Sequence, residues 1–316
     1  MDEISLDPTG FPVERPVPPD HRSGFVALVG RANVGKSTLL NQLVGRKVAI
    51  VSAVPQTTRT RVLGVRTTPN SQIAFIDSPG LHKPQHQMGE LMNEAARSAA
   101  ADADVIVVVV DASTGIGPGD VFVLEQLDPA RESRPVLMAL NKVDLMNKGK
   151  LLPMIERAVS EFHVRDVVPV SALSGDNCDE LLKVATALLP LGPPLYPDDF
   201  VTDQDDRRFV AEVIREKLLV GLRQEVPHSV AVAIERMERR DDGLAEIHAA
   251  ILVERDSQKA IVIGAHGARL KEVGTKARLE LESILGTRVF LRLWVKVRED
   301  WRDKISILRE LGMYPE

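Results

Sequence analysis

One segment near the amino end combines glycines, a lysine and a hydroxyl group in an order that serves phosphate chemistry. Residues 30–37 read Gly-Arg-Ala-Asn-Val-Gly-Lys-Ser and match the loop G-x-x-x-x-G-K-[ST]. A strand-like apolar run precedes the loop and a helical pattern follows it, the setting in which backbone N–H groups wrap phosphates. Lys36 then places its charge on the outer phosphates and Ser37 ligates Mg²⁺. An accidental glycine turn is the alternative. The predicted phosphate-binding residues are Gly30, Arg31, Ala32, Asn33, Val34, Gly35, Lys36, Ser37 and Thr38.

Three later segments, residues 77–80, 141–144 and 171–173, follow predicted strands and extend the same site. In Asp77-Ser-Pro-Gly80, the aspartate can hold the metal through water and the glycine N–H can meet a γ-phosphate. In Asn141-Lys-Val-Asp144, the Asp144 carboxylate can accept hydrogen bonds from two guanine N–H groups, a pair that adenine lacks. The joint order of the motifs predicts a guanine nucleotide and disfavours ATP. The residues assigned to this part of the site are Asp77, Ser78, Pro79, Gly80, Leu81, Asn141, Lys142, Asp144, Ser171, Ala172 and Leu173.

The residue after the D-x-x-G glycine is Leu81, where many GTPases carry a glutamine that orients the attacking water. A leucine side chain cannot orient water by hydrogen bonds. We therefore expect slow intrinsic hydrolysis that depends on a cation, on backbone groups or on a partner. His82 and His86 are spaced like metal ligands, but a solvated loop is the favoured interpretation because no further His or Cys lies nearby in the sequence.

Apolar runs at 25–29, 105–110, 135–140 and 167–170 alternate with helical patterns, and Pro69-Asn-Ser71 predicts a hairpin. This rhythm indicates an α/β fold, with a mostly parallel sheet covered by helices on both faces. After a proline-rich stretch the order becomes α-β-β-α-α-β. We expect a flexible proline-rich tail (1–22), a nucleotide domain (23–190), a linker (191–204), a small α+β domain (205–298) and a C-terminal helical tail (299–316).

The second domain carries a local basic excess that the net charge of -5 conceals. Residues 259–298 hold nine Lys or Arg against three Asp or Glu, around the loop Gly264-Ala-His-Gly267. A G-x-x-G loop that opens a helix lets a nucleic-acid backbone approach closely, as in type II KH domains. On the last strand, basic and aromatic residues share one face, which suits phosphate contact and base stacking; a solvated face is the alternative. The predicted RNA-binding residues are Gly264, Ala265, His266, Gly267, Arg269, Lys271, Lys276, Arg288, Arg292, Trp294 and Lys296.

Taken together, these motifs resemble the Era family of P-loop GTPases. The sequence has one such nucleotide domain, which distinguishes it from the related double GTPases that carry two. The order of its motifs is not circularly permuted, which excludes another ribosome-linked group of GTPases. The resemblance covers about residues 24–298 and rests on residues 30–37, Pro55-Gln-Thr-Thr-Arg59, Asp77-Ser-Pro-Gly-Leu-His82, 141–144, 171–173, Tyr196–Asp203 and 264–267.

The resemblance implies roles beyond those read from the residues. Thr58 is the switch I residue that meets Mg²⁺ and the γ-phosphate, with Thr57 as the alternative. Ser37, Thr58 and Asp77 hold Mg²⁺, and Lys36, Thr58 and Gly80 serve catalysis. Asn33 coordinates K⁺, although a turn-forming asparagine is an equal alternative.

The resemblance also implies partners: GTP and GDP, a single-stranded segment at the 3′ end of 16S ribosomal RNA, and the small (30S) subunit during its assembly. It further implies a link to growth and the cell cycle and weak peripheral association with the cell membrane. We expect a monomer that does not bind DNA. An RNA-binding scaffold with a merely structural nucleotide is a rival interpretation; a small-molecule kinase is a third, but it leaves Asp144 unexplained.

Composition narrows the protein class. Hydrophobic residues make up 44% of the chain and charged residues 27%, as in an ordinary folded protein. We find no apolar segment of membrane-spanning length and no secretory signal, and a single cysteine, Cys178, excludes an internal disulfide. These features predict a cytoplasmic protein.

Overall fold

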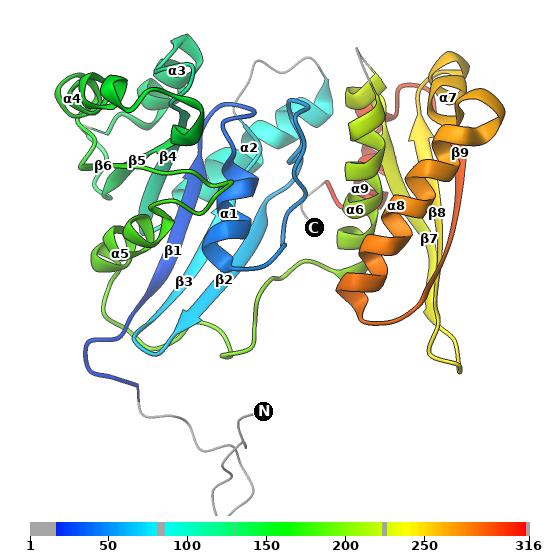
Figure 1. The fold of residues 1–316 in the computed structure, drawn as a ribbon, viewed down its shortest axis with the longest axis horizontal. Helices are drawn as coiled ribbons and strands as arrows, with labels where there is room; N and C mark the ends of the chain where they lie inside the picture. The colour runs from blue at the N-terminus through cyan, green and yellow to red at the C-terminus, as the bar shows by residue number, and fades with distance from the viewer. Residues whose placement is uncertain (1–16, 81–85, 130, 223–225, 314–316) are drawn as a thin grey trace, which may run out of the picture.

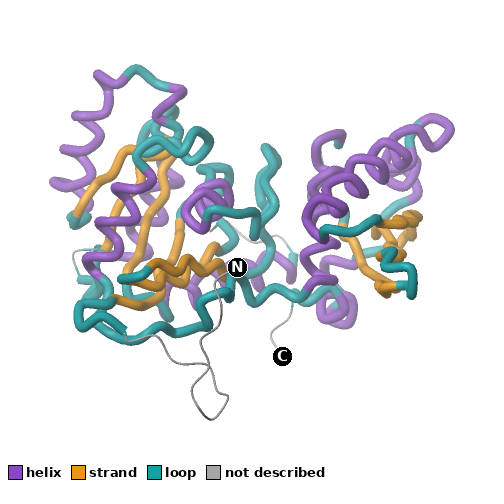
Figure 2. The backbone as a smooth tube through the Cα atoms, turned by 60° about the horizontal axis from the view of Figure 1, so that its bottom comes forward, coloured by secondary structure: helices purple, strands orange, loops and turns teal. Residues whose placement is uncertain are grey.

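The computed structural model describes residues 17–80, 86–129, 131–222 and 226–313. These residues form two units, each built around its own sheet (Figure 1). In Figure 2 the two sets of strands stand apart, with helices and loops between them. The fold class predicted from the sequence is confirmed.

The first unit contains a six-stranded sheet with the order β2-β3-β1-β4-β5-β6. β2 and β3 are antiparallel and every other pair is parallel. The predicted hairpin at residues 69–71 joins β2 to β3. The strands are β1 (Arg22–Val29), β2 (Val62–Thr68), β3 (Ser71–Asp77), β4 (Val105–Asp111), β5 (Val136–Asn141) and β6 (Asp166–Pro169).

Helices cover both faces of this sheet, because its central strands are apolar on both sides. Alternate residues of β4 divide between two cores: Val107 packs with α1 and α5, whereas Val108 packs with α3 and α4. The parallel arrangement brings the carboxyl ends of β1, β3, β4, β5 and β6 to one edge, where all the predicted nucleotide motifs lie. The helices are α1 (Lys36–Val44), α2 (Gln87–Ala101), α3 (Pro118–Leu127), α4 (Leu151–Phe162) and α5 (Cys178–Leu188).

The second unit has the predicted order α-β-β-α-α-β. Its sheet runs β7-β8-β9, with β7 antiparallel and β9 parallel to β8. α6 and α8 cover one face of the sheet, where Ile247 and Ile251 pack with Val213 and Ala277. The elements are α6 (Asp206–Gly221), β7 (Ala231–Arg239), β8 (Ala245–Val253), α7 (Asp256–Ile263), α8 (Ala268–Leu285) and β9 (Val289–Val297).

The expected boundary between the N-terminal tail and the first unit shifts toward the N-terminus. β1 begins at Arg22, and His21 is only 3% exposed, because its Nδ1 lies 2.7 Å from the carbonyl oxygen of Gly192. The linker also packs along the first unit: Gln72 Oε1 accepts a hydrogen bond from the Tyr196 amide at 2.8 Å. Residues 1–16 lie outside the described part of the chain.

The segment expected to be a C-terminal tail belongs to the fold. It forms a short 3₁₀ helix, η5 (Trp301–Asp303), followed by α9 (Ile305–Glu310). Trp301 and Leu308 are both fully buried and pack with Ala231 and Ala250, on the face of the β7-β8-β9 sheet opposite α6 and α8. This packing explains why the segment is ordered: it covers apolar residues that the helices leave open.

Candidate functional site

Two glycines shape the loop between β1 and α1. Gly30 has φ +151° and Gly35 has φ +97°, conformations that side chains disfavour. A Cβ atom at Gly30 would lie 2.5 Å from the carbonyl oxygen of Val109, and one at Gly35 would lie 2.4 Å from Nδ2 of Asn141. The loop can therefore take this shape only with glycine at both positions.

Lys36 lies folded along the inside of the loop. Its Nζ donates hydrogen bonds to the carbonyl oxygens of Gly30, at 3.0 Å, and Arg31, at 2.9 Å. Burial lowers the pKa of Lys36 to about 8, although the Asp77 carboxylate opposes this effect. A bound phosphate would supply the missing negative charge and favour the protonated lysine.

Ser37, Thr58 and Asp77 meet in one hydrogen-bonded cluster. Ser37 Oγ lies 2.6 Å from Asp77 Oδ2 and 2.8 Å from Thr58 Oγ1. Thr57 does not join them, because its hydroxyl donates to the carbonyl oxygen of Val54 at 2.6 Å. Of the two neighbouring threonines, Thr58 is therefore the one whose side chain faces the predicted metal ligands.

The donor set suits Mg²⁺. Two hydroxyl groups and a carboxylate are the hard oxygen ligands that this ion takes, with phosphates and waters completing its shell. Asp77 is fully buried, and its Oδ1 has no hydrogen-bond partner among the described residues. Burial raises the pKa of Asp77 against the opposing charge of Lys36. A divalent cation bound directly or through water would satisfy the buried oxygen and hold the group ionised.

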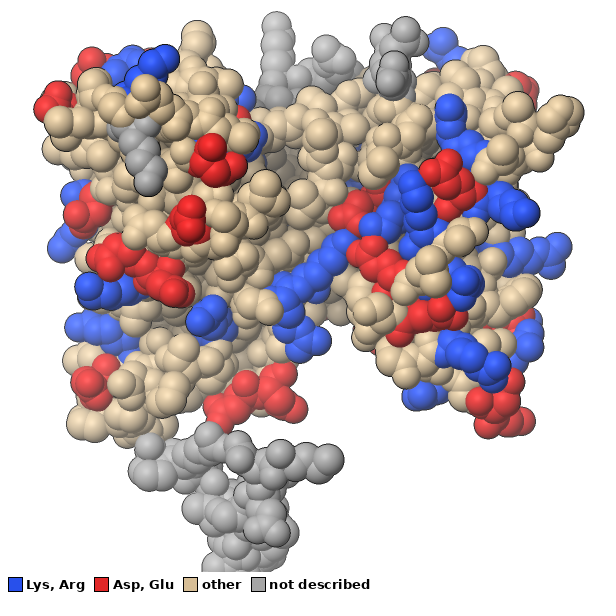
Figure 3. Space-filling model, in the orientation of Figure 1, with Lys and Arg blue, Asp and Glu red and all other residues tan. Residues whose placement is uncertain are grey.

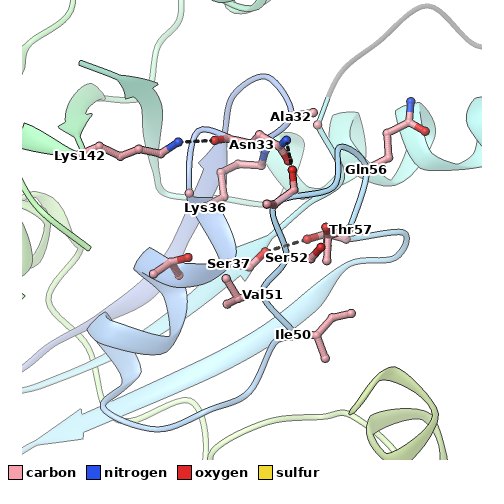
Figure 4. A pocket seen from close by; sticks show the side chains of 15 residues that line it. Ala32, Asn33, Lys36, Ser37, Ile50, Val51, Ser52, Gln56, Thr57 and Lys142 are labelled. Carbon is pink, nitrogen blue, oxygen red and sulfur yellow. Dashed lines mark hydrogen bonds between the residues drawn. The ribbon is translucent and has the colours of Figure 1, made fainter. Parts of the chain in front are cut away.

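A cavity of about 340 Å³ lies beside this cluster. Figure 4 shows its lining, which comes from residues 32–38 on one side and from residues 50–58 on the other. Gly80 also lines it, and a Cβ there would lie 2.7 Å from the Ala32 amide nitrogen, so this glycine permits close contact with the phosphate loop. Ser78 and Pro79 are buried behind the cavity, and Leu81 and His82 lie outside the described residues.

Lys142 braces the phosphate loop. Its Nζ donates to the carbonyl oxygen of Asn33 at 2.8 Å and to Asp111 Oδ2 at 2.7 Å (Figure 4 shows the first of these contacts). Burial raises the pKa of Asp111, but the hydrogen bonds from Lys142 and Ser113 outweigh it and leave the pKa lowered. The motif 141–144 thus stabilises the loop from outside, in addition to any contact with a base.

The predicted guanine-binding residues lie beyond the phosphate cavity. Asp144 lies exposed on a short 3₁₀ helix (Val143–Leu145), and Leu173 is 81% exposed on the neighbouring loop. Asn141 connects that loop to the phosphate loop, since it bonds both Val34 and Ala172. Ser171 is fully buried and takes part in the turn rather than in the surface.

The sequence reasoning missed two acidic residues that support the loop. Asp120 of α3, only 1% exposed, pairs with the Arg31 guanidinium at 3.0 Å and so directs that side chain away from the cavity. Asp111 was missed as the partner of Lys142, although its place at the end of β4 could have indicated it.

The G-x-x-G loop connects α7 to α8 in the second unit. Gly264, at φ +75°, packs closely on Arg269, whereas a Cβ at Gly267 would meet nothing within 4 Å, so the loop is open there. Beside it lies a groove of about 420 Å³. The groove is lined by Gly267, Leu270, Lys271, Gly274, Thr275, Arg278, Leu291 and Leu293.

The structure separates the predicted RNA-binding residues into two surfaces. Lys271 lines the groove, as do Leu291 and Leu293 of β9. Arg292, Trp294 and Lys296 alternate with these leucines and point to the sheet face opposite α6 and α8.

On that opposite face, acidic residues accompany the basic ones. Lys296 pairs with Glu235 at 2.5 Å and its Nζ lies 5.7 Å from the Trp294 ring centroid. Away from that face, Lys276 of α8 pairs with Glu272 at 2.7 Å, and the Arg269 guanidinium bonds the Ile261 carbonyl oxygen. Figure 3 shows the same mixture of charges over the second unit on the side in view. The groove adjoins the open Gly267 and carries Lys271, which forms no ion pair within the described residues, so the groove is the better candidate surface.

Residues 47–59, the switch I segment, contact α6. Glu216 accepts a hydrogen bond from the Val51 amide at 2.8 Å and pairs with Lys47 at 2.7 Å. Arg215 donates to the carbonyl oxygen of Thr57. The segment that supplies Thr58 to the cavity is thus also part of the interface between the two units, a role that no local motif indicated.

Fold and site together define a P-loop GTPase joined to a KH domain. Residues 25–142 match the family model of the 50S ribosome-binding GTPases, and residues 225–302 match that of the KH domain. A crystal structure of an Aquifex aeolicus Era variant bound to GDP·AlF₄⁻ is 43% identical, covers 92% of this chain and 99% of its own, and superposes with a TM-score of 0.89. A structure of Era with MgGDPNP and nucleotides 1506–1542 of 16S ribosomal RNA is 42% identical, with coverage of 93% and 99% and the same TM-score.

The chain belongs to the Era family of GTPases. Among the residues that the structure describes, no helix has both the length and the apolar character needed to cross a bilayer.

Proposed function

We propose that this chain is a GTP-hydrolysing switch that binds the 3′ end of 16S ribosomal RNA through its KH groove during assembly of the 30S subunit. The observation that carries the nucleotide half is the cluster of Ser37, Thr58 and Asp77 beside a cavity lined by the phosphate loop. The RNA half follows from the open G-x-x-G loop and from the ribosomal RNA bound by the Era structure described above.

In this proposal each loop has one task during hydrolysis. Mg²⁺, when bound, supplies charge that stabilises the phosphate oxygens. Lys36 leaves the carbonyl groups of the loop and pairs with the β- and γ-phosphates, while the Gly80 amide meets the γ-phosphate. The side chain of Leu81 offers no hydrogen bond to water, so we expect the intrinsic rate to be low.

We further propose that Asn33 takes part in binding K⁺. It adopts φ +64°, is exposed beside the cavity, and donates to the carbonyl oxygen of Ala53 in switch I at 2.8 Å. The amide group that makes this contact also carries an oxygen, and side-chain amide and backbone oxygens suit a monovalent cation. A turn-forming asparagine is the alternative, and in that case hydrolysis would proceed equally in K⁺ and Na⁺.

For the RNA, we propose that the groove holds unpaired nucleotides. Small residues at Gly267 and Gly274 let the backbone approach, the leucines offer apolar contact to bases, and Lys271 faces the phosphates. Lys271 forms no ion pair within the described residues, so its charge is available. Action in the cytoplasm as a monomer, with weak association at the cell membrane, is part of the same proposal.

A hydrolysis assay separates this function from that of an RNA-binding scaffold with a structural nucleotide. We expect slow release of phosphate from GTP that rises on addition of K⁺ and of an RNA with the 16S 3′-terminal sequence. A scaffold would bind the same RNA and retain its nucleotide without turnover in any of these conditions.

A further inference from the structure

Trp301 lies at a point where three parts of the molecule meet. It is fully buried, and its indole Nε1 donates to the carbonyl oxygen of Ser229, at the start of the KH sheet, at 2.9 Å. Figure 1 shows the C-terminal segment that carries it, in red, at the boundary between the two units beside α6. The residue therefore has contacts that a mere tail would not make.

Switch I reaches this tryptophan through Arg59, the residue directly after Thr58. The Arg59 guanidinium lies 5.6 Å from the centroid of the Trp301 ring and donates to the carbonyl oxygen of Val230 at 2.8 Å. Arg59 is 6% exposed, and burial, together with the nearby charge of Arg215, lowers its pKa to about 9. Backbone oxygens and an aromatic ring restrain this buried arginine, and with it the chain directly after Thr58.

α2, the helix that follows the D-x-x-G segment (switch II in GTPases), reaches the same segment. Met88 and Met92 of α2 pack in one cluster with Trp301 and Leu308. The first turn of α2 has no side-chain cap of its own, and Asp303 supplies one: its Oδ1 accepts from the Gln87 amide at 2.9 Å.

Asp303 makes a second contact with the start of α2. Its Oδ2 lies 3.1 Å from His86 Nδ1. The hydrogen bond from the Gln87 backbone amide holds the pKa of Asp303 below its usual range, and the contact with His86 adds a smaller effect in the same direction. The carboxylate is thus fixed at the point where α2 begins.

We propose that Trp301 and Asp303 are positioning residues for GTP hydrolysis. They hold switch I through Arg59, and the switch II helix through its first turn, against the KH sheet, so that movement of either switch is passed to the RNA-binding unit. Neither residue touches the nucleotide cavity; both act through the switches. This inference rests on the proposed function. It assigns the coupling between nucleotide and RNA binding to a segment outside the nucleotide motifs and outside the G-x-x-G loop.

The first test replaces Asp303 with asparagine, because its side chain is 47% exposed and the change leaves the packing of Trp301 in place. We expect the kcat of Asp303→Asn to fall roughly fivefold while the KM for GTP stays unchanged, since the amide removes the negative charge that favours the amino end of α2. Asp300→Asn is the matched control: it lies three residues earlier, is exposed, and occupies a left-handed conformation that asparagine tolerates. Its rate should equal that of the unmodified chain.

A second test follows the tryptophan itself. The chain has two tryptophans, so Trp294→Phe leaves Trp301 as the only one. We expect its emission to change when GDP is exchanged for a non-hydrolysable GTP analogue with Mg²⁺, because the ring lies beside Arg59 of switch I and packs in one cluster with Met88 and Met92 of α2.

Wild-type kinetics for Asp303→Asn in an active chain, or a Trp301 emission that ignores the nucleotide, would overturn this inference alone. A chain that binds GTP and never hydrolyses it would overturn the proposed function, and this inference with it.

Discussion

The amide nitrogen of Asn141 donates a hydrogen bond to the carbonyl oxygen of Val34 across 2.8 Å. The same side chain accepts from the Ala172 amide at 2.9 Å, so one residue ties the phosphate loop to the loop at 171–173. Asn141 is 1% exposed, and each of its two bonds satisfies a buried backbone group. A side chain known for its place in a nucleotide motif is thus also a structural support.

Replacing this residue should damage both stability and binding. We expect Asn141→Ala to lower the free energy of unfolding by about 2 kcal/mol, because two buried backbone groups lose their partners. GDP affinity should fall by more than about tenfold for the same reason. Urea unfolding without nucleotide measures the first effect and GDP titration the second. Asn147→Ala, at an exposed asparagine whose side chain bonds the nearby Gly149 amide and no other group in the described part of the chain, should change neither.

Asp144 should set the choice of base. Replacing its carboxylate with an amide, Asp144→Asn, removes two charge-assisted hydrogen bonds to guanine, and we expect GTP affinity to fall roughly 100-fold. A xanthine nucleotide, which offers a carbonyl group where guanine has its amino group, should bind the variant better than GTP. Asp144 is exposed, so the thermal midpoint should not move. Unchanged guanine preference would remove Asp144 from the site.

The two threonines of switch I should differ in their effect on hydrolysis. Thr58→Ala deletes the hydroxyl that lies 2.8 Å from Ser37 Oγ, and we expect the hydrolysis rate to fall at least about 10-fold, with a higher Mg²⁺ requirement. Thr57→Ala removes only a bond to the Val54 carbonyl oxygen within the loop, and its loss should be smaller. Phosphate release measured across a Mg²⁺ titration compares the variants. Equal losses, or a larger loss at Thr57, would contradict the assignment.

RNA affinity should distinguish the two faces of the KH sheet. Lys271 in the groove and Arg292 on the opposite face are both exposed, and neither forms an ion pair within the described residues. We expect Lys271→Ala to weaken binding of the 16S 3′-terminal RNA by about 1 kcal/mol and to reduce its salt dependence, while Arg292→Ala has little effect. Filter binding over a range of salt concentrations tests this. The opposite order would move the RNA to the other face.

Cys178 should resist alkylation. Burial, followed by the charges of Asp179 and Asp176, raises the pKa of its thiol from 9 to about 11. At pH 8 the folded chain then carries about 100-fold less thiolate than the unfolded chain, and should react with iodoacetamide slower by at least that factor. Between pH 9 and pH 11 the unfolded state loses this proton first, so stability relative to Cys178→Ala should fall as pH rises through that window. Rapid labelling of the native chain would contradict the raised pKa.

The nucleotide motifs could be predicted because each is a short contiguous segment at the end of a strand, and parallel strands bring such ends together. Residues 30–37 and 77–80 therefore lie beside one cavity. The order of elements in both units was also predictable from apolar periodicity, since strands of period two and helices of period 3.6 differ locally.

Contacts that depend on distant packing could not be predicted. Alternation along β9 shows which of its residues share a face, but not which of the two faces the helices cover. Trp294 of β9 was therefore assigned to the same RNA-binding surface as Lys271 of α8, whereas the two residues lie on different surfaces. Nothing near Trp301 in the sequence indicates that Arg59 and α2 meet it, because those partners are more than 200 residues away. Long-range packing decides both features.

The central claim is that the nucleotide controls RNA binding, since switch I and α2 both contact the RNA-binding unit. The most direct measurement is the affinity of the full chain for the 16S 3′-terminal RNA with a GTP analogue and Mg²⁺, with GDP, and without nucleotide. We predict at least about tenfold tighter binding with the GTP analogue than with GDP. Identical affinity in all three states would contradict the account.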